Sequence, residues 1–280
     1  DHHSHGVIFV TGTTGSGKST TLASVLAYML KQKPYRVITL EDPIEYVIPS
    51  GVGVVTQRAI GQDTKTFSTA LRAAMRQDPD IIFVGEVRDA ETAEALLAAA
   101  ETGHLVFATM HVGAATLVPE RIVGMFKDAS EGEAAKKRLY NVLSGVLTQV
   151  LAPSKAGRSL CCEILPVGKM ERELFFKEDI AGLRRVMESS RFRLADSLAR
   201  LAGSGFCTET VARGLVNFQH EWDNDYFEEQ QEKRSVKLNS RICIPGRDGG
   251  DASAGRPIRP AGQMVIDDIS DTERQVIFDL

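Results

Sequence analysis

The stretch Val10-Thr-Gly-Thr-Thr-Gly-Ser-Gly-Lys-Ser-Thr20 contains the full pattern G-x-x-x-x-G-K-[ST], which is typical of phosphate-binding loops. The apolar run Val7–Val10 before it predicts a buried strand. The apolar residues after it keep the spacing of one helix face: Leu22, Val25, Leu26, Met29 and Leu30. Because strand, loop and helix follow in the order that such a loop requires, the pattern favours nucleotide binding over a chance glycine-rich turn.

The residue types in this stretch suit a triphosphate. Its glycines let backbone N–H groups converge on phosphate oxygens, and a helix that begins near Lys18 directs the positive end of its dipole to the same place. We expect Lys18 to contact the β- and γ-phosphates of ATP and Ser19 to bind Mg²⁺. The expected nucleotide-binding residues are Gly12, Thr13, Thr14, Gly15, Ser16, Gly17, Lys18, Ser19 and Thr20.

The composition is that of an ordinary soluble globular protein. The chain has 280 residues, of which 43% are hydrophobic and 25% charged, and its formal net charge is -4. This charge gives no reason to expect nucleic acid as a partner, and no apolar run reaches the roughly 18 residues of a membrane span. We therefore expect a cytoplasmic protein. The first residue is Asp rather than Met, so we also expect an incomplete chain, with residues 1–5 as an N-terminal remnant or linker.

The four cysteines give no sign of a zinc site or a disulfide framework. They contain no C-x-x-C pair, since two are adjacent and two stand far apart: Cys161, Cys162, Cys207 and Cys243.

Strands and helices are expected to alternate after the loop. Short apolar runs predict strands at 36–40, 52–55, 81–84 and 105–110, and helical spacing predicts helices at 67–75 and 91–101. Such alternation implies parallel strands joined by right-handed crossovers. We therefore expect an α/β fold with a doubly wound, mostly parallel sheet at 6–170.

The second half of the chain has weaker patterns. An apolar stripe from Ala135 to Val150 predicts a helix, and 159–165 predicts a further strand. Short helical patterns, one at 194–201 and another at 211–218, indicate a small helical C-terminal subdomain at 171–222. Residues 223–280 carry a charge run and a segment rich in Gly, Pro and Arg, for which we expect a disordered tail.

Acidic side chains are expected where the strands beside the loop end, because hydrolysis of a γ-phosphate needs a metal ion and a polarised water. Glu86 follows the apolar run 81–84, as the acidic residue of a Walker B strand does, although Gly85 fills the place where an Asp is commonest. Glu45 and Glu41 follow the preceding strand. We expect Glu86 to hold the metal or orient the attacking water. The alternative for each glutamate is a surface salt bridge.

Histidines stand on both sides of the strand 105–110. His111 follows its carboxyl end, the side on which phosphate binds in such sheets, and could sense the γ-phosphate. His104 precedes the strand, and a structural role is the alternative for both. His2, His3 and His5 are expected to belong to a flexible end rather than a metal site.

Four segments together resemble the secretion ATPases of type II secretion and type IV pilus systems. GTTGSGKSTT from Gly12, TLEDPIEY from Thr39, the stretch Thr56–Thr92 and TGHLVFATMH from Thr102 are similar, in order and spacing, to the Walker A, Asp box, Walker B and His box of that family. The resemblance is dense over 6–126 and continues weakly to about 219. Since the tetracysteine motif of the secretion branch is missing, the chain looks most like the PilT-type retraction ATPases.

This resemblance implies a RecA-like ATPase that works as a ring of six. It implies a homohexamer in the cytoplasm, expected when the family's upstream domain is present and held peripherally at the inner membrane by a platform protein of the pilus or secretion machine. By the same resemblance, Glu45 is the water-activating glutamate of the Asp box, Glu86 the Walker B residue, and His104 and His111 the His box. The expected catalytic residues are thus Glu45, Glu86 and His111, and the expected metal-binding residues are Ser19 and Glu86.

The chain differs from the family pattern in three ways. The family's upstream domain, which supplies arginines to the neighbouring active site, is not in this sequence. The residues after His111 lack the usual Thr-Asn or Thr-Thr, and 170–177 does not match the retraction signature helix. Two alternatives to a motor therefore stay open: a subunit that binds nucleotide in such a ring without hydrolysing it, and a monomeric P-loop kinase for a small metabolite.

Overall fold

The computed structural model describes residues 5–155, 157–190, 193–205, 207–208, 210–212 and 215. The expected tail at 223–280, His2, His3 and most of the helix expected at 211–218 lie outside these residues. Within them, no helix is both long and apolar enough to cross a membrane.

The described residues form one seven-stranded sheet in the order β3-β2-β4-β5-β1-β6-β7. Every neighbouring pair is parallel except β6 and β7, which form an antiparallel hairpin. The strands are β1 (Gly6–Thr11), β2 (Arg36–Glu41), β3 (Val54–Ala59), β4 (Ile81–Val84), β5 (Leu105–Met110), β6 (Leu143–Ser154) and β7 (Gly157–Pro166). This arrangement confirms the expected α/β fold with a mostly parallel sheet.

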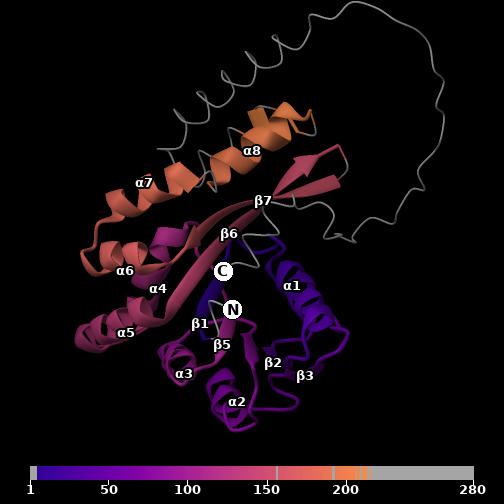
Figure 1. The fold of residues 1–280 in the computed structure, drawn as a ribbon, viewed down its shortest axis with the longest axis vertical. Helices are drawn as coiled ribbons and strands as arrows, with labels where there is room; N and C mark the ends of the chain where they lie inside the picture. The colour runs from indigo at the N-terminus through magenta and orange to yellow at the C-terminus, as the bar shows by residue number, and fades with distance from the viewer. Residues whose placement is uncertain are drawn as a thin grey trace, which may run out of the picture.

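Helices cover both faces of this sheet (Figure 1). The long helix α1 (Lys18–Gln32) packs on one face, where its buried Leu22, Leu26 and Leu30 meet Ile8 and Val10 of β1. The other face is covered by α2 (Phe67–Ala74), α3 (Ala90–Glu101) and α5 (Ala129–Val142). The fold is thus doubly wound, since helices pack on both faces of the sheet. Alternate residues of each buried strand contact opposite helix layers.

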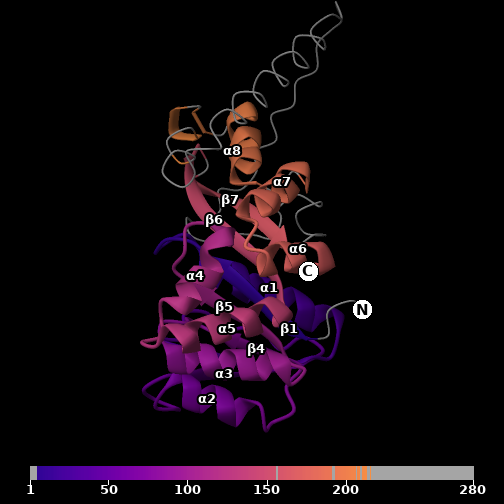
Figure 2. The same cartoon turned by 90° about the vertical axis from the view of Figure 1, so that its left-hand side faces the viewer.

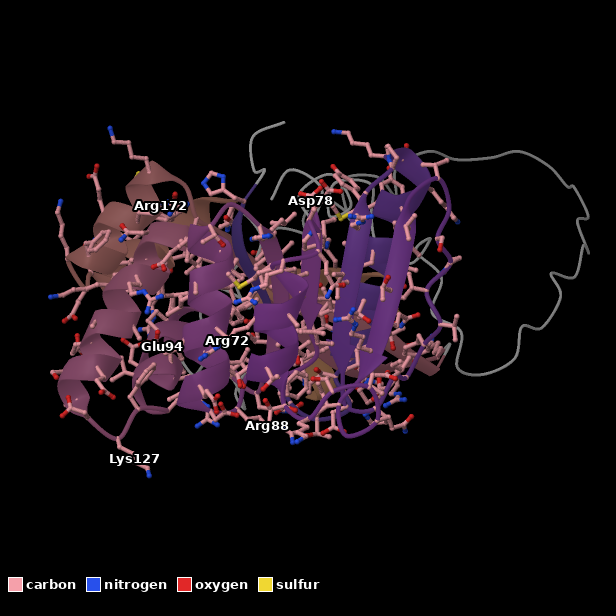
Figure 3. All side chains as sticks on the ribbon, turned by 90° about the horizontal axis from the view of Figure 1, so that it is seen from below. Arg72, Asp78, Arg88, Glu94, Lys127 and Arg172 are labelled. Atoms are coloured by element: carbon pink, nitrogen blue, oxygen red, sulfur yellow. The ribbon has the colours of Figure 1, made fainter. Side chains whose placement is uncertain are left out.

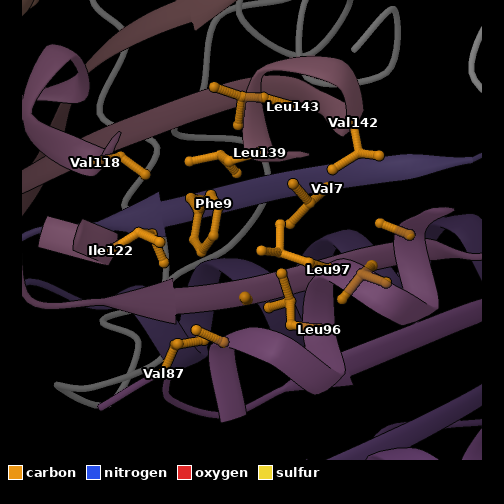
Figure 4. Close-up of a cluster of buried hydrophobic side chains, with 14 of the residues drawn as sticks. Val7, Phe9, Val87, Leu96, Leu97, Val118, Ile122, Leu139, Val142 and Leu143 are labelled. Carbon is orange, nitrogen blue, oxygen red and sulfur yellow. The ribbon is translucent and has the colours of Figure 1, made fainter. Parts of the chain in front are cut away.

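The larger core lies beneath α3 and α5. Figure 4 shows Phe9 of β1 among Leu96, Leu97 and Leu139, which come from these two helices. Figure 2 shows α2, α3 and α5 in a row over this face, and side chains of α2 and α3 pack in the same core. A 3₁₀ turn η1 (Ala115–Leu117) and helix α4 (Val118–Val123) contribute Ala115, Val118 and Ile122 to the same core.

The carboxyl ends of the parallel strands gather at one edge of the sheet. Figure 3 shows Asp78, which precedes β4, and Arg88, which follows it, at opposite edges. Because β1, β2, β4 and β5 run in the same direction, the segments that follow these four strands share the edge at which Arg88 lies.

The helix expected from Ala135 to Val150 is wrong in its second half. Helix α5 ends at Val142, and the chain continues at once as strand β6, between β1 and β7. All residues from Val142 to Val150 are buried. Because no face of this segment is exposed to solvent, its apolar residues show no strand alternation, and they match helical spacing by chance. The β-branched Val146, Thr148 and Val150 favour the strand.

The strand expected at 52–55 is displaced to β3, Val54–Ala59. The backbone N–H of Val52 donates to the carbonyl of Leu30 at the end of α1, so this residue belongs to a turn rather than to the sheet. Since β3 is an edge strand with partly exposed side chains, its sequence lacks the continuous apolar run of a central strand.

Helices follow β7, as expected: α6 (Lys169–Phe176), α7 (Ile180–Ser190) and α8 (Leu194–Gly203). Phe175 of α6 stacks on Tyr140 of α5, and Leu194 and Leu198 of α8 pack with Val150 of β6. The division into a core at 6–170 and a helical subdomain at 171–222 stays a proposal.

Candidate nucleotide-binding site

The segment between β1 and α1 has the backbone conformation of a phosphate-binding loop. Gly12, Gly15 and Gly17 all have positive φ, at 142°, 76° and 89°. At Gly12 a side chain is also excluded by space, because a Cβ atom would lie 2.4 Å from the carbonyl oxygen of Gln149. Thr13, Thr14 and Gly15 are exposed at the tip, and Ser19 and Thr20 are partly buried in the first turn of α1. The predicted nucleotide-binding residues thus form one continuous segment, made of the loop and the first turn of α1.

Lys18 lies inside this loop rather than extending into solvent. Its Nζ donates to the carbonyl oxygens of Gly12 and Thr13 at 3.0 and 2.9 Å, and the side chain is buried. Burial lowers the pKa of the ammonium, and the negative charges of Glu86 and Glu45 oppose part of this shift. A cation enclosed by neutral carbonyl groups is poised to bind an anion such as phosphate.

Glu86 and His111 come together at the carboxyl edge of the sheet. The Nε2 of His111 lies 3.3 Å from one carboxylate oxygen of Glu86, and Arg88 forms an ion pair with the other. Burial acts to raise the pKa of Glu86, but the hydrogen bond from Arg88 and the nearby positive charges outweigh it, so the pKa is lowered. Glu86 is therefore an ionised carboxylate at neutral pH.

The pKa of His111 is also lowered, chiefly by burial and also by the charge of Lys18, against the opposing effect of Glu86. The neutral ring is therefore the main form at pH 7, and its Nε2 faces the Glu86 carboxylate at 3.3 Å.

The backbone of the neighbouring strands fixes the position of Glu86. The N–H of Gly85 donates to the carbonyl of Leu40 at 2.7 Å, and the hydroxyl of Thr109 donates to the carbonyl of Gly85. A Cβ atom at Gly85 would lie 2.9 Å from the carbonyl oxygen of Leu40. Glycine is therefore required by close packing against β2, which explains why no Asp occupies this position.

Glu41, the last residue of β2, and Glu45, which follows this strand, differ in their surroundings. Glu45 is exposed, and its influence on the pKa of Lys18 is electrostatic. Glu41 is buried and accepts hydrogen bonds from Thr39 and Gln57, which gives it a structural role at the end of β2. Next to Glu45, the hydroxyl of Tyr46 lies 3.0 Å from that of Thr20, a contact that links this segment to the first turn of α1.

His104 lies away from this cluster. It precedes β5, at the amino edge of the sheet, and its Nδ1 donates to the carbonyl of Ala99 at 3.0 Å. The expected pair of His-box residues is therefore divided, since only His111 lies at the edge where Glu86 lies. His104 instead stabilises the end of α3, where backbone carbonyl groups need donors.

Sequence reasoning missed three residues that lie in or near the site. Arg88 pairs with Glu86, Gln149 donates to the carbonyl of Ser16 in the loop, and the buried Glu163 accepts from the N–H of Ala115, shortly after His111. For Gln149 and Glu163 the available signal was a polar residue inside an apolar run, because a buried polar side chain requires a partner. Arg88 is mostly exposed and gave no such signal. Reading the run around Gln149 as a helix concealed that signal.

The donor set suits Mg²⁺ bound together with a nucleotide. Within the described residues no group of three or more His, Cys, Asp or Glu side chains could hold a metal ion. Mg²⁺ usually binds through one or two protein oxygens together with phosphates and waters, rather than in a cage of protein ligands. The Ser19 hydroxyl and the Glu86 carboxylate are oxygen donors of this kind.

The fold and the loop define a P-loop nucleotide-binding protein, since the loop joins a central parallel strand to a helix and an acidic residue follows a neighbouring strand. Residues 2–218 match the family model described as type II/IV secretion system protein. The chain belongs to this family.

Several relatives of the chain are named as pilus proteins. The chain is 39% identical over 214 residues to a twitching motility protein of Neisseria gonorrhoeae, covering 74% of this chain and 57% of that protein. It is 44% identical over 174 residues to a Pseudomonas aeruginosa protein named type IV pilus retractation ATPase PilT, covering 62% and 50%. The chain thus spans about half the length of these relatives.

Among solved structures, the fold resembles the crystal structure of the pilus retraction motor PilT with bound ADP. The TM-score is 0.70 at 43% identity, covering 75% of this chain and 61% of that one. This similarity confirms the RecA-like fold expected from the sequence and the resemblance to PilT-type proteins.

Proposed function

We propose that this chain is the ATP-hydrolysing part of a motor subunit that powers type IV pilus retraction or a related secretion machine. The observation that carries the proposal is the placement of an ionised Glu86 and His111 at the sheet edge to which the loop holding Lys18 also belongs. The similarity to a retraction motor with bound ADP supports it. Like the family as a whole, the motor would act as a hexamer at a platform protein on the cytoplasmic side of the inner membrane.

Nucleotide binding in this proposal depends on Lys18 and the loop. The ammonium would exchange its two carbonyl contacts for the β- and γ-phosphate oxygens, which are stronger acceptors because they are charged. Backbone N–H groups from Thr13 to Thr20 would donate to the remaining phosphate oxygens. Ser19 would provide a ligand for Mg²⁺, which neutralises charge on the phosphates during hydrolysis.

Hydrolysis would require carboxylates that orient water toward the γ-phosphate. Glu86 is held by Arg88 and His111, so its carboxylate is positioned before substrate binds. Glu45 is exposed and carries a negative charge close enough to influence Lys18, so it is suited to contact water at the outer side of the phosphates. We assign water activation to Glu45, support of Mg²⁺ or its water to Glu86, and sensing of the γ-phosphate to His111.

Phosphate release and light scattering, measured on the same samples over a range of protein concentrations, test this function. The expected result is hydrolysis of Mg-ATP whose rate per subunit rises as rings form, and its loss in Glu86→Gln at unchanged ADP affinity. Rings that bind ATP without releasing phosphate would instead identify a nucleotide-responsive subunit that does not hydrolyse. Transfer of phosphate to a molecule other than water would identify a kinase.

A further inference from the structure

Gln149 of β6 contacts the phosphate-binding loop from outside the motif. Its side chain is fully buried, and its Nε2 donates to the carbonyl oxygen of Ser16 at 2.6 Å. A carbonyl oxygen can only accept, so the atom at this distance must be the amide nitrogen, which fixes the orientation of the side chain. The other amide atom, Oε1, is buried and has no partner among the described residues.

The contact is made by backbone as well as side chain. A Cβ at Gly12 would lie 2.4 Å from the carbonyl oxygen of Gln149, and one at Gly17 would lie 3.3 Å from its Nε2. Both ends of the loop therefore pack against this single residue. Strand β6 is itself fixed to β1, since Thr148 pairs with Thr11 and their hydroxyl oxygens are 2.8 Å apart.

The geometry of the peptide unit gives this hydrogen bond a consequence for phosphate binding. In a trans peptide the carbonyl of one residue and the N–H of the next lie in one plane and point in opposite directions. The carbonyl of Ser16 and the N–H of Gly17 form such a unit. When Gln149 holds the Ser16 carbonyl toward β6, the N–H of Gly17 is directed away from β6.

We propose that Gln149 is a positioning residue for phosphate binding, which holds the Ser16–Gly17 peptide in the orientation that presents its N–H to the β-phosphate of a nucleotide. The inference rests on the proposed nucleotide binding and does not depend on hydrolysis. Gly17 has a φ of 89°, so the peptide needs an external contact to select this orientation, because glycine also adopts others at little cost.

The test compares the affinities for ADP and AMP by calorimetry, with competition for the weaker ligand, in Gln149→Met. Met has a similar length and no hydrogen-bond donor. We expect ADP affinity to fall about tenfold, the usual effect of one hydrogen bond to a charged site. The affinity for AMP should change less than threefold, because AMP has no β-phosphate. The control is Gln62→Met, an exposed position, at which both affinities should stay unchanged.

A general loss of folding would lower both affinities together, so the preference for ADP over AMP separates positioning from stability. If Gln149→Met does not fold, Gln149→Asn carries the test, because it keeps the amide but shortens the stem by one methylene, out of reach of Ser16. An unchanged preference for ADP in a folded variant overturns the inference. Failure of the unmodified chain to bind ADP would instead overturn the proposed function.

Discussion

The Nε2 of His111 lies 3.3 Å from a carboxylate oxygen of Glu86. The two residues follow β5 and β4, neighbouring parallel strands that share a carboxyl edge. Their contact places a neutral imidazole and an ionised carboxylate side by side, each with a pKa below its ordinary value. Both shifts connect the site to the stability of the fold, since a pKa that changes on folding makes stability depend on pH.

Stability is expected to fall as the pH is lowered through 6.5, the ordinary pKa of histidine. Because the pKa of His111 is lower in the folded state, the unfolded chain binds the proton more readily and gains stability from it. The contribution is complete above pH 6.5 and decreases below it, and Glu86 adds a second decrease below its ordinary value of 4.5. Thermal melting of the unmodified chain and of His111→Gln between pH 7.5 and 5.0 measures it.

The His111→Gln variant should lose melting temperature less steeply with falling pH than the unmodified chain. The exposed Gln62→Met, which changes no titratable group, is the control and should follow the unmodified chain. Parallel curves for all three proteins would contradict the assignment of this slope to His111.

Glu86→Gln should abolish turnover while keeping ADP affinity within about threefold. The amide preserves the shape of the side chain but removes the negative charge, and loss of such a group typically costs about a hundredfold or more in rate. Phosphate release and calorimetry on the same preparation measure the two effects. A variant that hydrolyses at the full rate would show that the carboxylate takes no part in the chemistry.

Glu45→Gln should likewise bind nucleotide and lose turnover, for a different reason. Glu45 is exposed, so its replacement by Gln should leave the melting temperature within a degree or so of the unmodified protein. A loss of activity without a loss of stability would support water activation. Retained activity would show that Glu45 is an exposed surface residue that takes no part in hydrolysis.

Lys18→Met should weaken ADP binding by about 3 kcal/mol or more, because the phosphates would lose a buried cation. The same change should not destabilise the free protein. Burial lowers the pKa of Lys18, so the ammonium is held in the loop at a cost that the apolar Met avoids. Melting temperatures without and with ADP check both parts, and a large loss of stability without ligand would contradict this account of the loop.

Gly85→Ala should destabilise the fold by about 1–3 kcal/mol, since the added methyl would meet the Leu40 carbonyl at 2.9 Å and the Glu41 Cα at 3.2 Å. Gly113→Ala is a matched control, because no atom lies within 4 Å of the position of its Cβ. Urea unfolding of both variants measures the difference. Equal stability would show that β2 and β4 can separate without cost at this point.

The sequence by itself determined the loop, the strand before it, the helix after it and the family. Gly12, Gly17 and Lys18 could be recognised because a turn with positive φ and an enclosed ammonium restricts residue types at fixed, local spacing. The buried run before Glu86 was equally clear, since a central parallel strand is apolar on both faces.

Tertiary structure alone decided the partners of these residues. The physical reason for Gly85 is its short distance to Leu40, and the contact of His111 with Glu86 depends on β5 lying beside β4. The role of Gln149 depends on strand β6 lying beside β1, where local sequence had suggested a helix. An apolar run buried on every side carries no period, so its conformation is selected by the neighbours that pack against it.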